Sequence, residues 1–298
     1  MEIVVSGSTG LIGSALVSSL TAAGHKVVRL VRKSPRPGTS DVLWDPAKAY
    51  VDTTKLENKD AVVHLSGESI AERWTPKKKI RIQESRARGT HLLCEALRQL
   101  EHPPKVLVSG SAIGYYGDRG DEELREESPP GSGFLTDVCR QWEEATEPAA
   151  RRGIRVAHLR TGIVLSAKGG ALAKMLPPFR MGAGGRIGSG KQYMSWIAMD
   201  DHAAAIQHII ENPALQGPVN AVGPNPVRNL EFAKTLGKVL SRPAIIPLPA
   251  FAVRLAFGQM GEELLLASQR VEPARLKASG FSFRFPDLEA ALRHVLGR

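Results

Sequence analysis

The chain has 298 residues, 42% hydrophobic and 23% charged, an ordinary globular composition that excludes collagen, coiled coils and wholesale disorder. Forty Lys and Arg against thirty Asp and Glu give a formal net charge of +10, which favours anionic partners. Only two cysteines occur, which argues against a disulfide framework, and no apolar run reaches the roughly 18 residues of a membrane-spanning helix.

The first residues alternate between strand and helix patterns. The apolar run 3–5 ends at Ser6-Gly7 and is typical of a buried parallel strand. Residues 11–23 carry apolar side chains at three-and-four spacing and precede Gly24, which predicts a helix with a glycine C-cap. Residues 27–31 predict a second strand, so this region forms a βαβ unit.

The alternation continues along the chain. Residues 60–65, 105–109 and 154–159 predict strands, and residues 75–100 and 134–152 predict helices. Strands that alternate with helices indicate a parallel sheet covered on both faces. The predicted fold class is therefore α/β, a Rossmann-type doubly wound parallel sheet with a smaller, mostly helical C-terminal lobe.

A glycine-rich turn joins the first strand to the first helix. In G-x-x-G-x-x-G the first glycine permits a tight turn, the second a close approach to a pyrophosphate, and the third helix–strand packing. The N–H groups at the helix start attract an anion. The spacing departs from G-x-G-x-x-G at Ser8, and a turn without a ligand is the alternative. The predicted phosphate-binding residues are Gly7, Thr9, Gly10, Leu11, Ile12 and Gly13.

The end of the second strand bears on the choice of cofactor. An NAD enzyme usually carries an acid there, which accepts hydrogen bonds from the ribose 2′-hydroxyl. Here the strand is followed by Arg32 and Lys33, with Arg36 shortly after. A guanidinium can bind a 2′-phosphate that a carboxylate would repel. We therefore predict NADP(H) as the cofactor, the alternative being a solvated basic loop.

After Arg160 the composition changes. Residues 168–191 are rich in glycine and contain five Lys or Arg and no acid, which suits a binding loop. From about residue 223 the chain is rich in proline and mostly helical. We expect an NADP-binding Rossmann domain formed by 1–165 and 197–222, and a substrate lobe formed by 166–196 and 223–298.

Other partners are not favoured by the sequence. No recognition-helix motif or aromatic-interleaved basic groove is present, so no nucleic-acid partner is expected. No membrane partner is expected either, and no His, Cys or acidic residues have metal-ligand spacing. Because a strand pattern begins at Glu2, we expect no targeting segment. The low cysteine count favours a reduced, cytoplasmic location.

Together these residues resemble the extended short-chain dehydrogenase/reductase superfamily, and in particular its atypical nucleoside-diphosphate-sugar epimerase-like branch, some of whose members are labelled cell-division inhibitors. The resemblance covers nearly the whole chain. It rests on the glycine turn, the strand 60–65, Gly89-Thr90, Tyr115-Tyr116-Gly117-Asp118, Cys139 with Trp142-Glu143, the loop 175–180, Gly188–Gln192 followed by Trp196-Ile197, Asp200-Asp201, and Gly280–Phe283.

The resemblance implies further cofactor contacts around the ends of two strands and on the long helix. It also implies a possible homodimer, because many members of the superfamily pair through two long helices. Besides the glycine turn, Arg32 and Lys33, the implied cofactor residues are Leu65, Ser66, Gly67, Arg86 and Ser109.

The superfamily's usual proton relay is missing. It combines a Ser or Thr with a Tyr and a Lys four residues later on one helical face. With Glu143 as the register marker, Cys139 occupies the Lys position and Leu135 the Tyr position. Ala112 occupies the Ser position, with Ser111 beside it. Hydride chemistry therefore needs substitutes for these residues.

Candidate substitutes follow the fourth predicted strand. Ser111 is expected to hold a substrate oxygen, with Tyr115 or Tyr116 as acid–base. A tyrosine has an ordinary pKa of about 10 and needs a cationic neighbour to work at neutral pH. A structural role is the alternative for each of the three residues.

The sequence thus predicts an NADP(H)-binding, epimerase-like oxidoreductase that acts on an anionic small molecule. The alternative, which the missing Tyr-Lys pair favours, is an NADP(H)-binding sensor without turnover. The candidate substrate-binding residues are Glu68, Arg180, Arg186, Lys191 and Trp196.

Overall fold

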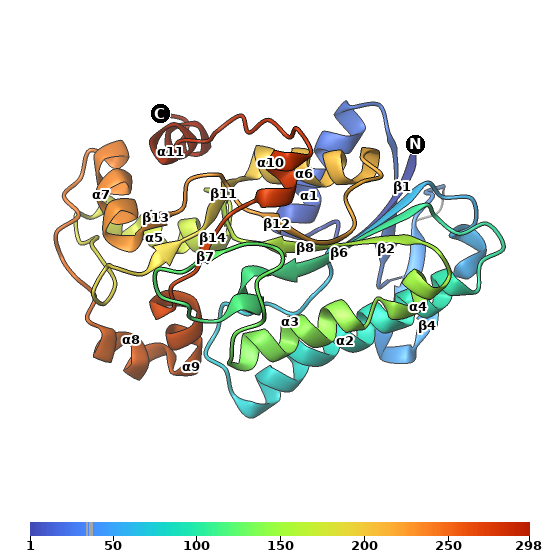
Figure 1. Ribbon diagram of the computed structural model, residues 1–298, viewed down its shortest axis with the longest axis horizontal. Coiled ribbons are helices and arrows are strands. Elements are labelled where there is room, and N and C mark those ends of the chain that lie inside the picture. The colour runs from blue at the N-terminus through green and yellow to red at the C-terminus, as the bar shows by residue number, and fades with distance from the viewer. Residues whose placement is uncertain (34, 36–37) are drawn as a thin grey trace.

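The computed structural model describes residues 1–33, 35 and 38–298, and its helices and strands are labelled in Figure 1. The strands are β1 (Glu2–Ser6), β2 (Lys26–Val31), β3 (Val42–Asp45), β4 (Tyr50–Val51), β5 (Ala61–His64), β6 (Val106–Ala112), β7 (Glu123–Leu124), β8 (Arg155–Thr161), β9 (Ile163–Leu165), β10 (Tyr193–Met194), β11 (Trp196–Ala198), β12 (Gly217–Ala221), β13 (Val227–Arg228) and β14 (Arg270–Val271).

The helices are α1 (Leu11–Ala22), α2 (Pro76–Arg98), α3 (Phe134–Glu144), α4 (Glu147–Arg151), α5 (Gly170–Arg180), α6 (Met199–Glu211), α7 (Asn229–Leu240), α8 (Ala250–Phe257), α9 (Gln259–Gly261), α10 (Ala274–Ala278) and α11 (Leu288–Leu296). Short helical turns are η1 (Pro46–Lys48), η2 (Thr53–Lys55), η3 (Ile113–Tyr116) and the π-helical η4 (Glu262–Leu266).

An eight-stranded sheet runs through the molecule in the order β12-β8-β6-β5-β1-β2-β3-β4. All neighbouring pairs are parallel except β3 and β4. The chain moves outward in one direction from β1 to β2 and in the other from β5 to β6. The strand order therefore reverses between β1 and β5, and in open α/β sheets ligands bind at the carboxyl ends of strands at such a point.

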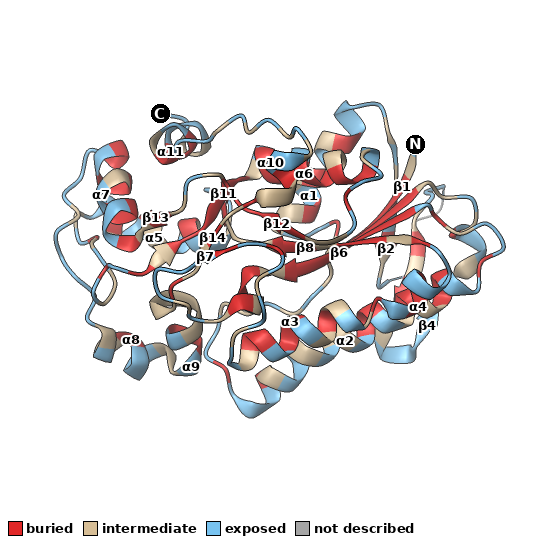
Figure 2. Ribbon diagram, in the orientation of Figure 1, coloured by how far each residue is buried: buried red, intermediate tan, exposed pale blue. Residues whose placement is uncertain are grey.

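The two faces of the sheet have separate cores. Because side chains alternate along a strand, Ile3 and Val5 of β1 pack with Leu16 of α1 on one face. Val4 points to the other face and packs with Leu93 of α2. In Figure 1, α1, α6 and α10 cover the first face and α2, α3 and α4 the second. Figure 2 shows the strands between them as buried, which confirms the predicted α/β class.

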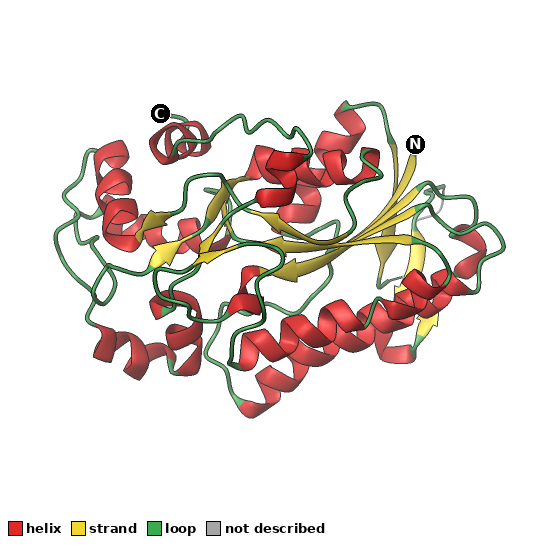
Figure 3. Cartoon of the chain, in the orientation of Figure 1, coloured by secondary structure: helices red, strands yellow, loops and turns green. Residues whose placement is uncertain are grey.

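A further core lies outside the main sheet. It combines residues of α5, α7 and α11 with the small β-pairs β10–β13 and β9–β11. Among its largest members are Phe179, Trp196 and Phe232. This core is formed mainly by residues from the predicted second lobe. The helices and short strands that carry them lie at the end of the molecule away from β4, as Figures 1 and 3 show together. The exact division of the chain into two lobes stays a prediction.

The structure corrects two sequence-based predictions of secondary structure. The helix expected over 134–152 is two helices, α3 and α4, separated at Ala145–Thr146, because Pro148 lies in the first turn of α4 and cannot continue the ladder of α3. The strands β3 and β4 at one edge of the sheet had no counterpart among the expected elements. In the described part of the chain, no helix is long and apolar enough to cross a bilayer.

Candidate cofactor and substrate site

The glycine turn lies where β1 meets β5. Gly7 has a φ of +67°, and a Cβ built on it would lie 3.0 Å from the carbonyl carbon of Leu65. A Cβ on Gly13 would lie 2.1 Å from the carbonyl oxygen of Gly7. Both positions therefore require glycine. No side chain caps the start of α1, so the first-turn N–H groups have no side-chain acceptor and can receive an anion.

Ser6 ties the glycine turn to the end of β5, a contact that sequence reasoning missed. Its Oγ lies 2.8 Å from Nδ1 of His64 and accepts hydrogen bonds from the N–H groups of Leu65, at 3.0 Å, and Ser66, at 3.3 Å. Burial lowers the pKa of His64 from 6.5 to about 4. His64 is thus a neutral core histidine, and the structure brings Leu65 and Ser66 beside the turn.

Arg32 and Lys33 lie exposed directly after β2, which pairs with β1. In the described part of the chain no acidic side chain forms an ion pair with Arg32, so its guanidinium is available to a ligand. Arg36 lies outside the described residues. Arg32 therefore follows the strand that lies next to β1, the strand that ends at the glycine turn.

Arg86 reaches from α2 to the loop after β5. Its Nη1 donates to the carbonyl oxygens of Glu68, at 3.0 Å, and Ile82, at 3.2 Å. A Cβ on Gly67 would lie 3.1 Å from the Arg86 Cζ, so the guanidinium covers this glycine. It also stands 5.0 Å from the ring centroid of Trp142. The structure thus brings Arg86 and Gly67 together.

Glu68 is occupied by two cations. Its carboxylate accepts a 2.7 Å hydrogen bond from Lys78 and lies 3.3 Å from Arg81. The hydrogen bond from Lys78 lowers the pKa of Glu68. Through these contacts Glu68 anchors the loop after β5 to the first turns of α2.

Ser111 belongs to a buried polar cluster at the carboxyl ends of β6 and β8. Its Oγ donates to Glu143 Oε1 of α3 at 2.7 Å. Arg160 binds the same carboxylate through Nε, at 2.8 Å, and Nη2, at 2.9 Å. Burial lowers the pKa of Arg160, but the hydrogen bonds to Glu143 outweigh it and raise the pKa above its ordinary value. Sequence reasoning used Glu143 only as a register marker.

The two tyrosines have different environments. Tyr116 is fully buried, and its hydroxyl donates to Asn220 at 2.7 Å and accepts from Arg160 at 3.1 Å. Burial raises its pKa to about 12. The geometry therefore argues against Tyr116 as an acid–base at a ligand. Tyr115 is half-buried, and its ring stacks on the Arg160 guanidinium, with Cζ 3.5 Å from the ring centroid.

The positions of the missing Tyr-Lys pair are filled by packing. Leu135 is buried, and its Cβ would lie 3.1 Å from a Cβ built on Gly114. Cys139 is buried with its Sγ 3.6 Å from the Ala112 carbonyl oxygen. Burial raises the thiol pKa to about 12, so Cys139 is a core residue and not a nucleophile at neutral pH.

The remaining candidates divide by exposure. Arg180, Arg186 and Lys191 are exposed. Trp196 is buried in the second core and donates from Nε1 to the Asn225 carbonyl oxygen at 3.1 Å, which argues against the predicted contact with a substrate. Ser109 is buried within β6, and within the described structure its Oγ has no hydrogen-bond partner.

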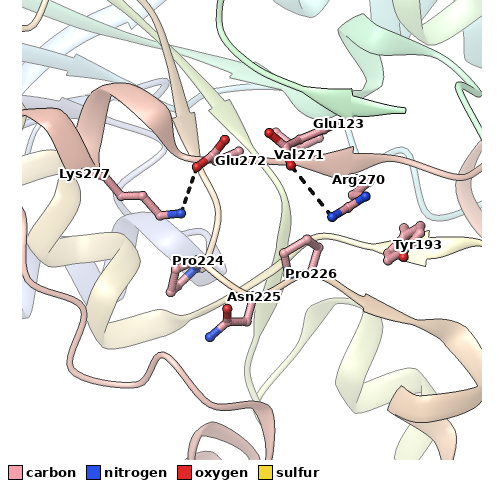
Figure 4. Close-up of a pocket in the computed structure, with 9 residues that line it drawn as sticks. All are labelled: Glu123, Tyr193, Pro224, Asn225, Pro226, Arg270, Val271, Glu272 and Lys277. Atoms are coloured by element: carbon pink, nitrogen blue, oxygen red, sulfur yellow. Dashed lines mark hydrogen bonds and ion pairs between the residues drawn. The ribbon is translucent and has the colours of Figure 1, made fainter. Parts of the chain in front are cut away.

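A separate cavity of about 260 Å³ lies beyond the end of β12, and none of the predicted site residues lines it. Figure 4 shows its two ion pairs, Lys277–Glu272 at 3.0 Å and Arg270–Glu123 at 3.8 Å. Its charged groups are thus already paired with one another. Elsewhere in the described residues, no group of three or more His, Cys, Asp or Glu is placed to hold a metal ion.

Comparison with known proteins gives consistent matches. The model of the NAD dependent epimerase/dehydratase family matches residues 3–223, and that of a domain of unknown function, DUF1731, matches residues 248–295. An epimerase family protein of Mycobacterium tuberculosis, MT2273, is 42% identical over 99% of this chain and 98% of that protein.

Solved structures agree with these matches. The human epimerase family protein SDR39U1, solved with NADPH, is 38% identical and covers 100% of both chains with a TM-score of 0.91. The UDP-N-acetylglucosamine 4-epimerase of Bacillus cereus, 17% identical over 99% of this chain and 98% of that one, has a TM-score of 0.79 and shows likeness of fold alone.

Proposed function

Since the chain belongs to the NAD dependent epimerase/dehydratase family, we propose that it is an oxidoreductase or epimerase that uses NADPH and acts on a small anionic molecule. The observation that carries the proposal is the juxtaposition of the Gly7–Gly13 turn with Arg32, which has no ion-pair partner among the described residues, at neighbouring strand ends. The human relative solved with NADPH supports the same cofactor here.

The residues present fit this cofactor. A pyrophosphate would fit beside the glycine turn, because Gly7 and Gly13 have no Cβ and the start of α1 has no side-chain cap. Thr9, Gly10, Leu11 and Ile12 complete the turn. Arg32 and Lys33 would bind the 2′-phosphate. The site would be completed by the loop residues Leu65, Ser66 and Gly67, by Arg86, and by Ser109. When bound, NADPH supplies a hydride to a substrate carbon or its oxidised form takes one up.

The polar cluster at Ser111 supplies a route for the proton. Ser111 would hold the substrate oxygen, and Glu143, which accepts the Ser111 hydroxyl at 2.7 Å, is the proton acceptor in its reach. When a substrate hydroxyl is oxidised, its proton passes to Ser111 Oγ while the Ser111 proton passes to Glu143. Arg160 fixes the Glu143 carboxylate through two hydrogen bonds. Tyr115 remains a second candidate for acid–base.

An anionic substrate is favoured by the charge of the second lobe. The segment 166–199 contains five Lys or Arg and no acid. Its exposed side chains Arg180, Arg186 and Lys191 could bind an anionic substrate. We propose that the lobe that carries them is formed by 166–196 and 223–298. The separate core in this part of the chain supports that division.

We further propose a homodimer through the long helices, which light scattering tests.

The test of turnover uses fractionated metabolite extracts and the consumption of NADPH at 340 nm. A fraction that drives consumption with wild type should lose most of its effect with Ser111→Ala and keep it with Ser18→Ala, a control on the exposed side of α1. Tyr115→Phe then separates the two proton routes, because it removes the hydroxyl and keeps the ring on Arg160. Equal rates for wild type and Ser111→Ala would contradict the proposed role of Ser111.

One observation favours a second function, an NADPH-binding sensor without turnover. Leu135 and Cys139 are packed into the core where the superfamily's Tyr and Lys stand. If wild type binds NADPH and no extract fraction causes its oxidation, the sensor is the better account. Steady consumption of NADPH with any fraction would exclude it.

A further inference from the structure

A strip of large apolar side chains lies exposed on the second lobe, in α8 and in the segment that leads to it. Figures 1 and 2 place this region at the opposite end of the molecule from β4, with α8 largely exposed. Soluble domains rarely leave such side chains together in water without a partner. The apolar strip comprises Ile245 (81% exposed), Ile246 (53%), Leu248 (40%), Phe251 (71%) and Leu255 (77%).

The apolar strip is held in place by the loop beside it. Ile246 donates its N–H to the Gly184 carbonyl oxygen at 3.0 Å, and Leu248 donates to that of Arg186 at 2.8 Å. Leu248 in turn accepts from the Gly188 N–H at 2.8 Å. Prolines at 243, 247 and 249 fix the backbone further. The apolar side chains are therefore presented by a built surface.

The charge around the apolar strip is mostly positive, although Arg254 of α8 is paired with Glu262 at 2.7 Å and Lys238 of α7 with Glu289 at 2.6 Å. Residues 232–261, which contain the strip, hold four Lys or Arg and no acid. Residues 166–199, which contain the loop hydrogen-bonded to it, hold five Lys or Arg and no acid. Arg242, which precedes the strip, donates to the Arg180 carbonyl oxygen at 3.1 Å. Segments 232–261 and 166–199 therefore meet at this point as well. A partner for this surface must offer both negative charge and an apolar interior.

We propose that the apolar strip docks onto the surface of an anionic lipid bilayer, with Phe251 and Leu255 entering the headgroup boundary and the exposed Arg186 and Arg242 meeting lipid phosphates. A second copy of the chain fits less well, because a twofold contact would set the same cations against each other. A nucleic acid fits less well because the strip is mostly aliphatic and offers few rings for base stacking.

This inference goes beyond the proposed function and does not depend on it. The expectation of no membrane partner rested on the absence of an apolar run long enough to span a bilayer. A helix that lies on a bilayer needs no such run, only an exposed apolar face beside cations. The eight residues of α8 and the segment before it provide both.

The test is co-sedimentation of the full chain with vesicles of phosphatidylcholine, with and without phosphatidylglycerol. We expect wild type to bind the anionic vesicles, and the double variant Phe251→Glu/Leu255→Glu to bind at least about tenfold more weakly. Tyr50→Glu changes an exposed ring at the other end of the molecule and should leave binding unchanged. NADPH binding, measured on the same variants, should not change.

Four outcomes would overturn the proposal. Wild type that stays in the supernatant with anionic vesicles would do so, as would a double variant that binds as wild type does. Equal binding to neutral and anionic vesicles would refute the charge argument. A dimer in light scattering that the double variant dissociates would assign the strip to a second copy. Because NADPH binding is read separately, failure here leaves the proposed function standing.

Discussion

Replacing Arg160 with Met should destabilise the fold strongly, because it strands a buried carboxylate. Arg160 is 3% exposed and gives Glu143 two hydrogen bonds, at 2.8 and 2.9 Å, and Tyr116 a third, at 3.1 Å. Removing one partner of a buried ion pair costs about 3–5 kcal/mol, since the remaining charge loses its compensation. Whole-domain stabilities are only about 5–15 kcal/mol, so the effect is a large fraction of the total.

Two further variants test this reasoning. Removing both charges, in Arg160→Met/Glu143→Leu, should recover most of the loss, because apolar replacements of a whole buried pair are often neutral. The control is Arg151→Met, which breaks an exposed ion pair with Glu147 on α4 and should cost less than about 0.5 kcal/mol.

The assay is equilibrium unfolding in urea followed by tryptophan fluorescence, with the urea midpoint read at a constant slope. A loss below about 1 kcal/mol in Arg160→Met would show that the pair is not compensated as described. A double variant as unstable as the sum of the two single variants would show that the two side chains are not coupled.

Three other predictions follow from buried groups. Gly13→Ala places a Cβ 2.1 Å from the Gly7 carbonyl oxygen, so we expect a loss of about 1–3 kcal/mol in stability and no thermal shift with NADPH; a normal shift would contradict this. Burial lowers the pKa of both His64 and His202 from 6.5 to about 4, so the unfolded chain binds more protons between these values. Stability should therefore fall as pH drops from 6.5 to 4, by on the order of 3 kcal/mol for each histidine. A urea midpoint that stays flat over this range would refute that reading. Burial raises the thiol pKa of Cys94 and Cys139 to about 12, so iodoacetamide at pH 8 should label both far more slowly in the native chain than in urea, as mass spectrometry will show; equal rates would disprove their burial.

The features that could be predicted are local in sequence. The alternation of apolar runs and helical spacing fixes the order of β1, α1 and β2, and the glycine turn has a meaning because it lies between a strand and a helix. The break between α3 and α4 had a local signal in Pro148, which the predicted helix 134–152 ignored. The two-residue strand β4 has only a weak local signal, so tertiary packing decided it.

The features that sequence reasoning missed join distant residues. Ser6 and His64 are 58 positions apart, and Ser111 and Glu143 are 32 apart. No spacing rule links such pairs before the sheet places their strand ends side by side. A charged residue at the end of an apolar strand, as Arg160 is, was the available signal for the buried cluster.

Burial also decided which candidates failed. Tyr116 and Trp196 were predicted as site residues from motifs, and both are buried with their polar atoms bonded to protein. Aromatic residues in a motif serve packing as readily as binding, and one sequence cannot separate the two uses. Arg86, in contrast, needed the structure to show that its guanidinium turns back over Gly67.

The central claim is that the Gly7–Gly13 turn and Arg32 together bind NADPH. Calorimetric titration of NADPH and NADH into wild type, Arg32→Asp and Arg29→Asp tests it most directly, since Arg29 is an exposed arginine of β2, the strand that Arg32 follows. We predict a strong preference for NADPH in wild type and Arg29→Asp, and a loss of NADPH affinity of about tenfold to a hundredfold in Arg32→Asp. Equal affinity for both cofactors, or no binding by wild type, would contradict the claim.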